Sequence, residues 1–148
     1  MIEFLDYQCP FCRAGGPAVD SAVAAGVRVA VVHLPLPIHP PATGAALVAL
    51  CAQRFDEFRD VHHFLLLNTD WIEVAPDSLG KQFGEVSQNP NVARCIADME
   101  TEVGLLLQAH VGLATKLGVS STPYFISRGR QHRGLPSTES LVKLARGN

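Results

Sequence analysis

The sequence predicts one α/β domain whose strands are interrupted by a block of helices. Its 148 residues are about the length of a single domain. β-Branched runs near the N-terminus and strand-like patterns after residue 118 enclose a long region in which apolar residues recur at three- and four-residue spacing. The expected order is strand, helix, strand, several helices, a hairpin and a last helix, without repeats or low-complexity segments.

The composition fits a folded domain and argues against several kinds of partner. Hydrophobic residues make up 47% of the chain and charged residues 18%, which is enough apolar surface for a buried core. The net charge is −2 and lysines and arginines do not cluster, so neither a nucleic acid nor an anionic membrane surface is indicated as a partner. No apolar stretch reaches the roughly 18 residues that predict a membrane-spanning helix.

The first elements follow from short apolar runs and their breaks. Residues 2–6 are predicted to form a buried strand, and residues 27–34 (VRVAVVHL) a second one. A helix is expected over 14–25, and Pro10 suits the first helical position because its missing N–H would be unpaired there. The two glycines before Pro17 are poor helix residues, so a kink or a late helix start is expected at that point.

The region between the strands is predicted to be helical after an irregular start. Four prolines in residues 35–41 exclude regular structure in that segment. Residues 42–53 are strong helix formers, and the apolar spacing over 55–65 predicts a second helix. A weaker helix is expected over 77–86 and another over 91–99.

The last part of the chain is predicted to return to the sheet. A helix is expected over 101–117, ended by Gly118. Its shared apolar face is expected to consist of Val103, Leu106, Leu107, Val111, Ala114 and Leu117. A hairpin is expected over 124–134, and Ser137 is a candidate N-cap for a final helix over 138–145.

A Cys-x-x-Cys motif lies directly after the first predicted strand, at the start of a helix. Cys9 and Cys12 share one helical face and can close a short disulfide. Unpaired N–H groups and the positive dipole end at a helix start stabilise a thiolate, so the pKa of Cys9 is expected to be lowered. Half of a zinc site is the alternative, but there is no second Cys-x-x-Cys, and the adjacent His62 and His63 point to different faces of one helix. A redox function is therefore favoured over a metal site.

Two segments far apart in the sequence carry a family resemblance. The first is residues 2–12 (IEFLDYQCPFC), a strand followed by the CPFC motif, and the second is residues 118–125 (GVSSTPYF). Between them, residues 34–36 (LPL) and 39–40 (HP), an alanine-rich helix and an aromatic helix are similar to the helical insertion of the same family. Over nearly its whole length the chain resembles the DsbA-like thiol-disulfide oxidoreductases.

The resemblance implies a thioredoxin-like fold with an inserted all-helical domain. The thioredoxin-like domain would comprise residues 1–34 and 118–148, and the helical insertion would comprise residues 35–117. The implied activity is dithiol–disulfide exchange with cysteine-containing protein substrates, without a cofactor.

The resemblance also implies roles for individual residues. Cys9 would be the exposed nucleophile, and Cys12 would resolve the mixed disulfide. Pro123 would follow a cis peptide bond beside the two sulfurs, although a trans proline entering a strand is the alternative. Thr122 would face the substrate chain and pair with it through its backbone. The residues implied to bind substrate are Pro10, Phe11, Thr122 and Pro123.

An acidic residue in the first strand is a further candidate. Glu3 lies six residues before Cys9, where the resembled family often has a carboxyl beneath the resolving cysteine. A buried carboxyl there would have a raised pKa and could accept the Cys12 proton during exchange. Exposure at an edge of the sheet is the alternative, and the alternation of strand faces argues mildly against it.

The direction of the redox chemistry is less strongly indicated. The dipeptide between the cysteines is Pro-Phe, whereas the most oxidising family members carry Pro-His, so the potential of Cys9 is expected to be less extreme. Threonine before the proline also occurs in dimeric isomerase relatives, but their separate dimerisation domain is missing here and a monomer is expected. Oxidation is favoured. A reductase or isomerase of the same fold and a non-catalytic thioredoxin-fold binding module are the alternatives.

The second pair of cysteines bears on location. Cys51 and Cys95 lie in two predicted helices of the insertion and could be buried free thiols. Some actinobacterial-type relatives carry a second bridge in this region, and that resemblance favours a structural disulfide. A disulfide would place the domain in the periplasm or cell envelope, where a membrane redox partner is possible, with the cytoplasm as the alternative. The chain begins within a predicted strand, so no signal peptide is expected within it, and removal of an upstream strand, signal peptide or membrane anchor is left open.

Overall fold

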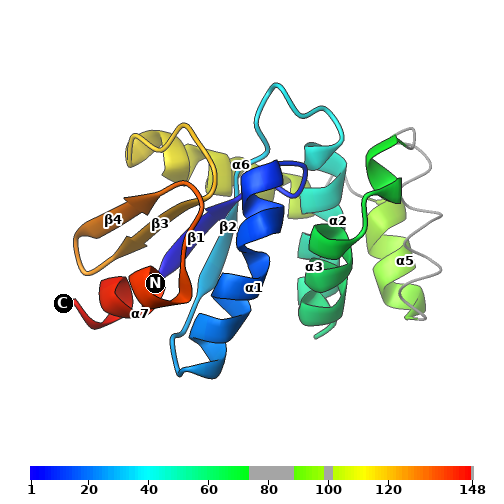
Figure 1. Ribbon diagram of the computed structural model, residues 1–148. Coiled ribbons are helices and arrows are strands. Elements are labelled where there is room, and N and C mark those ends of the chain that lie inside the picture. The colour runs from blue at the N-terminus through cyan, green and yellow to red at the C-terminus, as the bar shows by residue number, and fades with distance from the viewer. Residues whose placement is uncertain (74–88, 99–101, 148) are drawn as a thin grey trace.

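The computed structural model describes residues 1–73, 89–98 and 102–147, and its centre is a four-stranded mixed sheet (Figure 1). The strands are β1 (Ile2–Leu5), β2 (Ala30–His33), β3 (Tyr124–Ser127) and β4 (Arg130–Arg133). Their order is β2-β1-β3-β4, with β1 parallel to β2, and with β3 antiparallel to both β1 and β4.

The register brings three loops to one end of the sheet. Leu5, at the end of β1, is the partner of His33 at the end of the parallel strand β2. Phe4 is the partner of Tyr124, which begins the antiparallel strand β3. The segment after β1, the segment after β2 and the segment before β3 therefore leave the sheet at the same end. These are the segments that contain the Cys-x-x-Cys motif, the four prolines and the Thr-Pro pair.

Helices cover both faces of the sheet. On one face, α1 (Pro10–Ala24) and α7 (Thr138–Arg146) share a buried cluster with β3 that contains Val19, Leu141 and Phe125. On the other face, α6 (Glu102–Lys116) contributes Ala114 to a cluster that includes Phe4 of β1. Burial on both faces fits the apolar character of β1.

The remaining helices stack beside α1 (Figure 1). They are α2 (Ala42–Arg54), α3 (Phe58–Leu67), the short 3₁₀ helix η1 (Asp70–Glu73) and α5 (Pro90–Ala97). α2 is buried along most of its length, because its alanines let α3, α5 and α6 all pack against it closely. Trp71 is completely buried and its indole N–H donates to the carbonyl of Leu65 at 3.1 Å.

Most of the predicted elements are present within one to three residues of their expected bounds. The segment 35–41 has no regular structure, the hairpin turns at Arg128-Gly129, and Ser137 caps α7 as part of a capping box. The helix expected over 77–86 lies outside the described residues. Of the helices that are described, none combines the length and the apolar character that a bilayer crossing requires. The division into residues 1–34 with 118–148 and residues 35–117 stays a prediction.

The predicted late start of the first helix is wrong. α1 begins at Pro10 and continues through Pro17 as one helix. Gly15 is required there by a distant contact, because a Cβ at this position would lie 2.8 Å from Cδ of Pro136, just before α7. The glycine therefore permits close packing of two helices rather than ending one.

The predicted apolar face of α6 is only partly correct. Val103, Leu107 and Ala114 are buried, but Leu106, Val111 and Leu117 are 41%, 37% and 47% exposed. The helix is apolar on most sides, so its sequence does not indicate which side has a partner. The packing against α2 and β2 selects the side that is buried.

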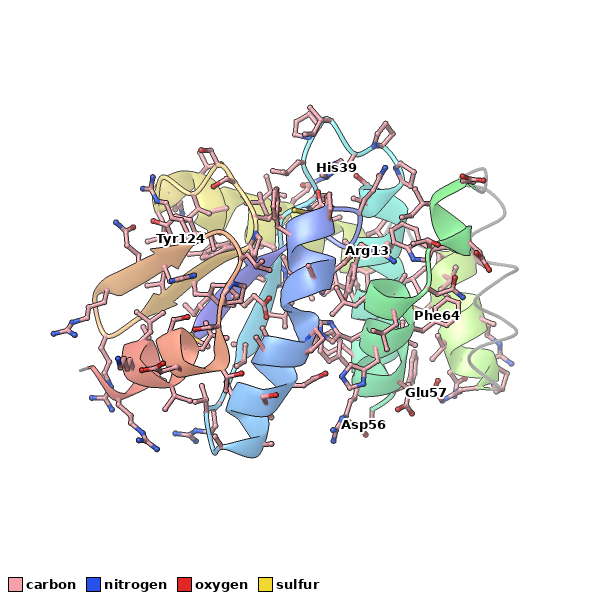
Figure 2. All side chains as sticks on the ribbon, in the orientation of Figure 1. Arg13, His39, Asp56, Glu57, Phe64 and Tyr124 are labelled. Carbon is pink, nitrogen blue, oxygen red and sulfur yellow. A yellow bond between two sulfur atoms is a disulfide. The ribbon has the colours of Figure 1, made fainter. Side chains whose placement is uncertain are left out.

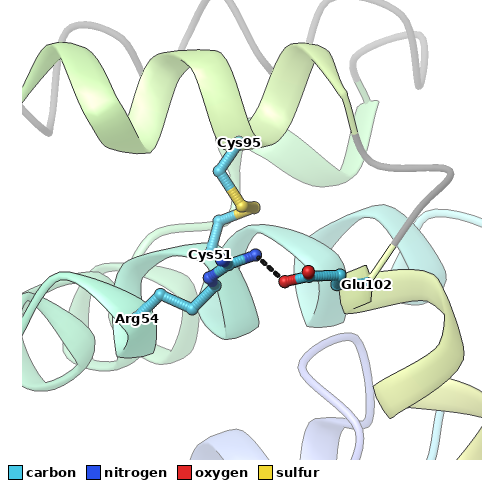
Figure 3. The surroundings of a disulfide bond; sticks show 4 residues. All are labelled: Cys51, Arg54, Cys95 and Glu102. Atoms are coloured by element: carbon cyan, nitrogen blue, oxygen red, sulfur yellow. Dashed lines mark ion pairs between the residues drawn. A yellow bond between two sulfur atoms is a disulfide. The ribbon is translucent and has the colours of Figure 1, made fainter.

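Cys51 and Cys95 form a disulfide that joins α2 to α5 (Figure 3). Their Cα atoms are 5.7 Å apart, and Cys51 is completely buried. Next to it, Arg54 at the end of α2 pairs with Glu102 at the start of α6 at 2.8 Å. The exposed ion pair adds little stability by itself, so the disulfide is the stronger of the two links among these helices.

Replacing Cys51 and Cys95 together by alanine should lower the free energy of unfolding by up to about 4 kcal/mol, because the bridge closes a loop of 44 positions in the unfolded chain. Denaturant titration of the oxidised proteins measures this difference. Mild reductant should open Cys9–Cys12 first and leave two free thiols. A variant as stable as the wild type, or four free thiols after mild reduction, would contradict a structural bridge.

Candidate active site

The two cysteines of the Cys-x-x-Cys motif lie where β1 turns into α1. Cys9 is the N-cap residue of α1, with an extended backbone, and Cys12 lies in the first helical turn. Arg13, one residue further on, donates to the carbonyl of Asn68 at 3.0 Å and so ties this turn to the end of α3 (Figure 2). The dithiol therefore lies at a fixed helix start, where backbone N–H groups are available to a negative charge.

Cys9 is more enclosed than its expected role as an exposed nucleophile implied. Both cysteines are free thiols, and only 4% of Cys9 and 1% of Cys12 is exposed. The Cys9 sulfur lies 3.4 Å from the carbonyl oxygen of Thr122, to which it donates when protonated, and the Thr122–Pro123 peptide bond is cis. The segment before β3 covers the sulfur from this side. The fold thus brings together the two motifs that the sequence separates by more than a hundred residues.

The pKa of Cys9 is lowered from 9.0 to about 5. The largest cause is a hydrogen bond from the Cys12 thiol, which favours the Cys9 thiolate. The side chain of Thr122 and the backbone N–H groups of Phe11 and Cys12 lower it further, against the opposing effect of burial. At neutral pH Cys9 is therefore a thiolate, the form that attacks a disulfide.

The pKa of Cys12 is raised far above its ordinary value, chiefly by burial and then by its hydrogen bond to Cys9. The two shifts share one cause, the hydrogen bond between the sulfurs, whose proton stays with the more buried Cys12. This arrangement assigns the attacking thiolate to Cys9. Cys12 keeps its proton until it has to close the disulfide.

The predicted substrate-contacting residues differ in exposure. Pro10 is exposed and Phe11 is 58% exposed, so both are free to touch a substrate. Thr122 is only 8% exposed, so its side chain is enclosed, and its expected backbone pairing with a substrate chain stays a prediction. Its buried hydroxyl is close enough to lower the pKa of both thiols, without a well-aligned hydrogen bond to either.

Glu3 is buried rather than exposed at an edge. It is 3% exposed, and burial, followed by the nearby charge of Asp20, raises its pKa from 4.5 to about 8. It borders a cavity of about 380 Å³ between α1, β2 and α3, which Asp20, His62 and His63 also line. The carboxyl therefore changes its protonation state close to neutral pH. Its part in catalysis stays a prediction.

Asp6 is the residue of this site that sequence reasoning missed. Its side chain is completely buried and accepts hydrogen bonds from the backbone N–H groups of Gln8, Cys9 and Leu36 and from the ring of His39. A polar residue that ends an apolar strand immediately before CPFC was a local signal. Its partners beyond residue 30 were not visible from spacing.

The histidines that the sequence could have offered to a metal are used elsewhere. His62 accepts or donates a hydrogen bond at 3.0 Å to the hydroxyl of Tyr7, whereas His63 pairs with Asp20, so the two do point to different faces. His110 accepts from the backbone N–H of His33. Within the described residues there is no group of three His, Cys, Asp or Glu side chains able to hold a metal ion.

Comparison with known proteins places the chain in a family. The family model described as thioredoxin matches residues 1–145. Over 144 residues the chain is 31% identical to the Na⁺/H⁺ antiporter NhaA 3 of Salinispora tropica, and equally to NhaA 1 of Salinispora arenicola. These matches include 95% of this chain but 22% of each antiporter, so the chain spans about a fifth of the length of these relatives.

Solved structures give the same fold. DsbA2 of Pseudomonas aeruginosa superposes with a TM-score of 0.79 at 20% identity, over 97% of this chain and 84% of that one. A thioredoxin-like oxidoreductase from Silicibacter pomeroyi gives 0.78 at 25% identity, over 99% and 86%. The thiol-disulfide exchange protein α-DsbA2 of Wolbachia pipientis gives 0.79 at 21%, over 99% and 79%. The predicted thioredoxin-like, DsbA-like fold is confirmed.

Alkylation of the reduced protein should follow the pKa of Cys9. We expect the rate of reaction with iodoacetamide to rise through a midpoint near pH 5, because the thiolate is the reacting form, and the modified residue to be Cys9. Peptide mapping identifies the labelled cysteine. Cys12→Ser, which replaces the thiol donor by a hydroxyl, should keep Cys9 reactive. A midpoint near pH 9, or faster labelling of Cys12, would contradict the assignment.

Proposed function

The chain belongs to the thioredoxin family and has the DsbA-like fold, and we propose that it is a protein thiol-disulfide oxidoreductase that exchanges disulfides with the cysteines of protein substrates. The observation that carries this proposal is the opposite displacement of two pKa values one helical turn apart: Cys9 is a thiolate at neutral pH and Cys12 a thiol. Two cysteines with a purely structural role do not require a reactive thiolate. The difference between the two pKa values therefore argues against a non-catalytic binding module.

The exchange needs only the two sulfurs and one proton acceptor. When the chain acts as an oxidant, a substrate thiolate attacks Cys9 of the Cys9–Cys12 disulfide, a mixed disulfide forms and Cys12 leaves as a thiolate, which takes up a proton. A second substrate thiolate then attacks the mixed disulfide and releases Cys9 as a stable thiolate. The substrate has lost two electrons and the chain has gained them. The reverse sequence reduces a substrate disulfide, with Cys9 attacking and Cys12 resolving.

We assign the proton transfer at Cys12 to Glu3. A buried thiol with a strongly raised pKa needs a base before it can act as a nucleophile, and a carboxyl with a pKa of about 8 is suited to exchange protons near neutral pH. The cavity beside Glu3 has room for water and leads past Asp20 and His63, which are partly exposed. That cavity supplies a route for the proton to reach solvent.

Oxidation is the direction that the site favours. A thiolate stabilised in the reduced form makes reduction of the disulfide easier, and hence makes the pair a stronger oxidant. Its stabilisation comes from Cys12, Thr122 and backbone N–H groups, so the missing histidine between the cysteines is compensated. The disulfide between Cys51 and Cys95 supports a location outside the cytoplasm, where exported proteins would be the substrates and a membrane protein the redox partner.

The reduction potential of the Cys9–Cys12 pair tests the direction. Equilibration with glutathione should give a value less negative than about −200 mV, in the range of oxidants and isomerases, whereas a reductase would lie near −270 mV. Cys12→Ser should accumulate a long-lived mixed disulfide between Cys9 and a substrate peptide, because no resolving thiol remains. Cys9→Ser should form none. Equal trapping by both variants would contradict the proposed order of attack.

Glu3→Gln should slow exchange at least about tenfold and also stabilise the fold. Because the pKa of Glu3 is about 8 when folded and 4.5 when exposed, the folded chain binds more protons between these values, and its stability falls as pH rises from 4.5 to 8. The variant lacks this loss and should gain roughly 4 kcal/mol at most at pH 8. Stopped-flow exchange and denaturant titration measure both effects.

The matched control is Glu139→Gln, which removes an exposed carboxylate paired with Lys143 and should change neither quantity much. If Glu3→Gln exchanges disulfides as fast as the wild type, the proton-transfer role is wrong even if the stability gain is found.

A further inference from the structure

Asp6 connects two loops through its two carboxylate oxygens. Oδ1 accepts from the backbone N–H groups of Gln8 at 2.8 Å and Cys9 at 3.1 Å, which fixes the turn that leads into the dithiol. Oδ2 accepts from the backbone N–H of Leu36 and from Nδ1 of His39, both at 2.8 Å. One oxygen therefore serves the dithiol turn, and the other serves residues 35–41, which we call the proline loop.

The buried carboxylate of Asp6 needs hydrogen-bond donors to offset the free energy of removing its charge from water. Its side chain is completely buried, and a buried charge without partners is strongly destabilising. Three backbone N–H groups and one imidazole satisfy it. His39 is the single side chain among these donors, and it is 15% exposed. The Asp6–His39 pair is thus the part of this network that depends on a side chain of the proline loop.

The proline loop lies next to the turn that leads into the dithiol, because Asp6 bonds to both. It leaves β2 at the end of the sheet where the dithiol lies, and Figure 2 shows His39 above the first turn of α1. Ile38, next to His39, is 77% exposed, and Phe11 in the first turn of α1 is 58% exposed. Two large apolar side chains are therefore exposed on the two segments that the carboxylate of Asp6 joins, at the end of the sheet where the enclosed sulfur lies.

We propose that the Asp6–His39 pair is a positioning pair that holds the proline loop as a wall of the substrate site, so that Ile38 contacts the polypeptide on which Cys9 acts. The proposal rests on the thiol-disulfide exchange proposed above and names the surface that recognises an apolar segment flanking the substrate cysteine. The bond from His39 is made to Oδ2, whereas Oδ1 keeps its bonds to the dithiol turn, so loss of the His39 donor acts on how a polypeptide is held and leaves the thiol chemistry unchanged.

Two substrates separate these effects. The oxidised chain, with Cys9–Cys12 closed, is mixed either with a peptide that carries two cysteines flanked by leucine and valine or with dithiothreitol. In each reaction two substrate thiols become one disulfide, while the Cys9–Cys12 disulfide becomes two thiols. His39→Ala should lower the rate constant for the peptide about tenfold, the loss expected for one hydrogen bond to a charged group, and leave the rate constant for dithiothreitol unchanged.

His39→Asn is the rescue variant, because its side-chain N–H can replace the Nδ1 donor without a titratable ring. It should recover most of the peptide rate. If the peptide rate of His39→Ala equals that of the wild type, or if both rates fall by the same factor, the proposal is wrong. Thermal unfolding at the assay pH confirms that each variant is folded.

Ile38→Ala tests the wall without disturbing the pair, since the side chain is mostly exposed. It should lower the peptide rate several-fold and leave the dithiothreitol rate unchanged. Leu105→Ala is the matched control, because Leu105 is 66% exposed and lies near the start of α6, where Glu102 meets the far end of α2. Equal effects of Ile38→Ala and Leu105→Ala would overturn the proposal. Failure of the wild type itself to oxidise dithiothreitol would instead overturn the proposed function.

Discussion

The fold must stabilise a negative charge on the Cys9 sulfur, although this sulfur is almost completely enclosed, and this constraint determines how the site is built. Burial alone would raise the pKa of a thiol, and in Cys9 burial does oppose ionisation. The hydrogen bond from the Cys12 thiol, the nearby hydroxyl of Thr122 and the N–H groups of the first helical turn outweigh it. The stabilisation comes from groups held in place by the fold, so it needs no basic side chain beside the sulfur.

The same constraint explains why three distant segments meet. The helix start supplies backbone N–H groups, and Asp6 fixes the turn between β1 and Cys9 that leads into it. The Thr122 carbonyl reaches the sulfur because β3 begins opposite the end of β1. The proline loop reaches Asp6 because β2 ends beside β1. A single sheet register thus determines the positions of all three.

The sequence was a good guide to local features and a poor one to distant contacts. The Cys-x-x-Cys motif, the proline-rich segment and the Ser137 cap depend on a few neighbouring residues, and each was predictable from them. The start of α1 was not predictable, because Gly15 is required by its close contact with Pro136 and does not mark a helix boundary. The enclosure of Cys9 and the contacts of Asp6 depend on how loops converge, which no periodicity records.

Three titratable side chains near the sheet have pKa values that keep them mostly neutral. The pKa of Glu3 is raised to about 8, and burial lowers the pKa of His33 to about 3 and of His62 to about 4. All three are therefore largely uncharged at neutral pH, and they lie on the side of the sheet toward α3, where the hydroxyl of Tyr7 bonds to His62. Of these three groups, Glu3 is the one whose protonation changes close to neutral pH, so it is the one able to exchange a proton there.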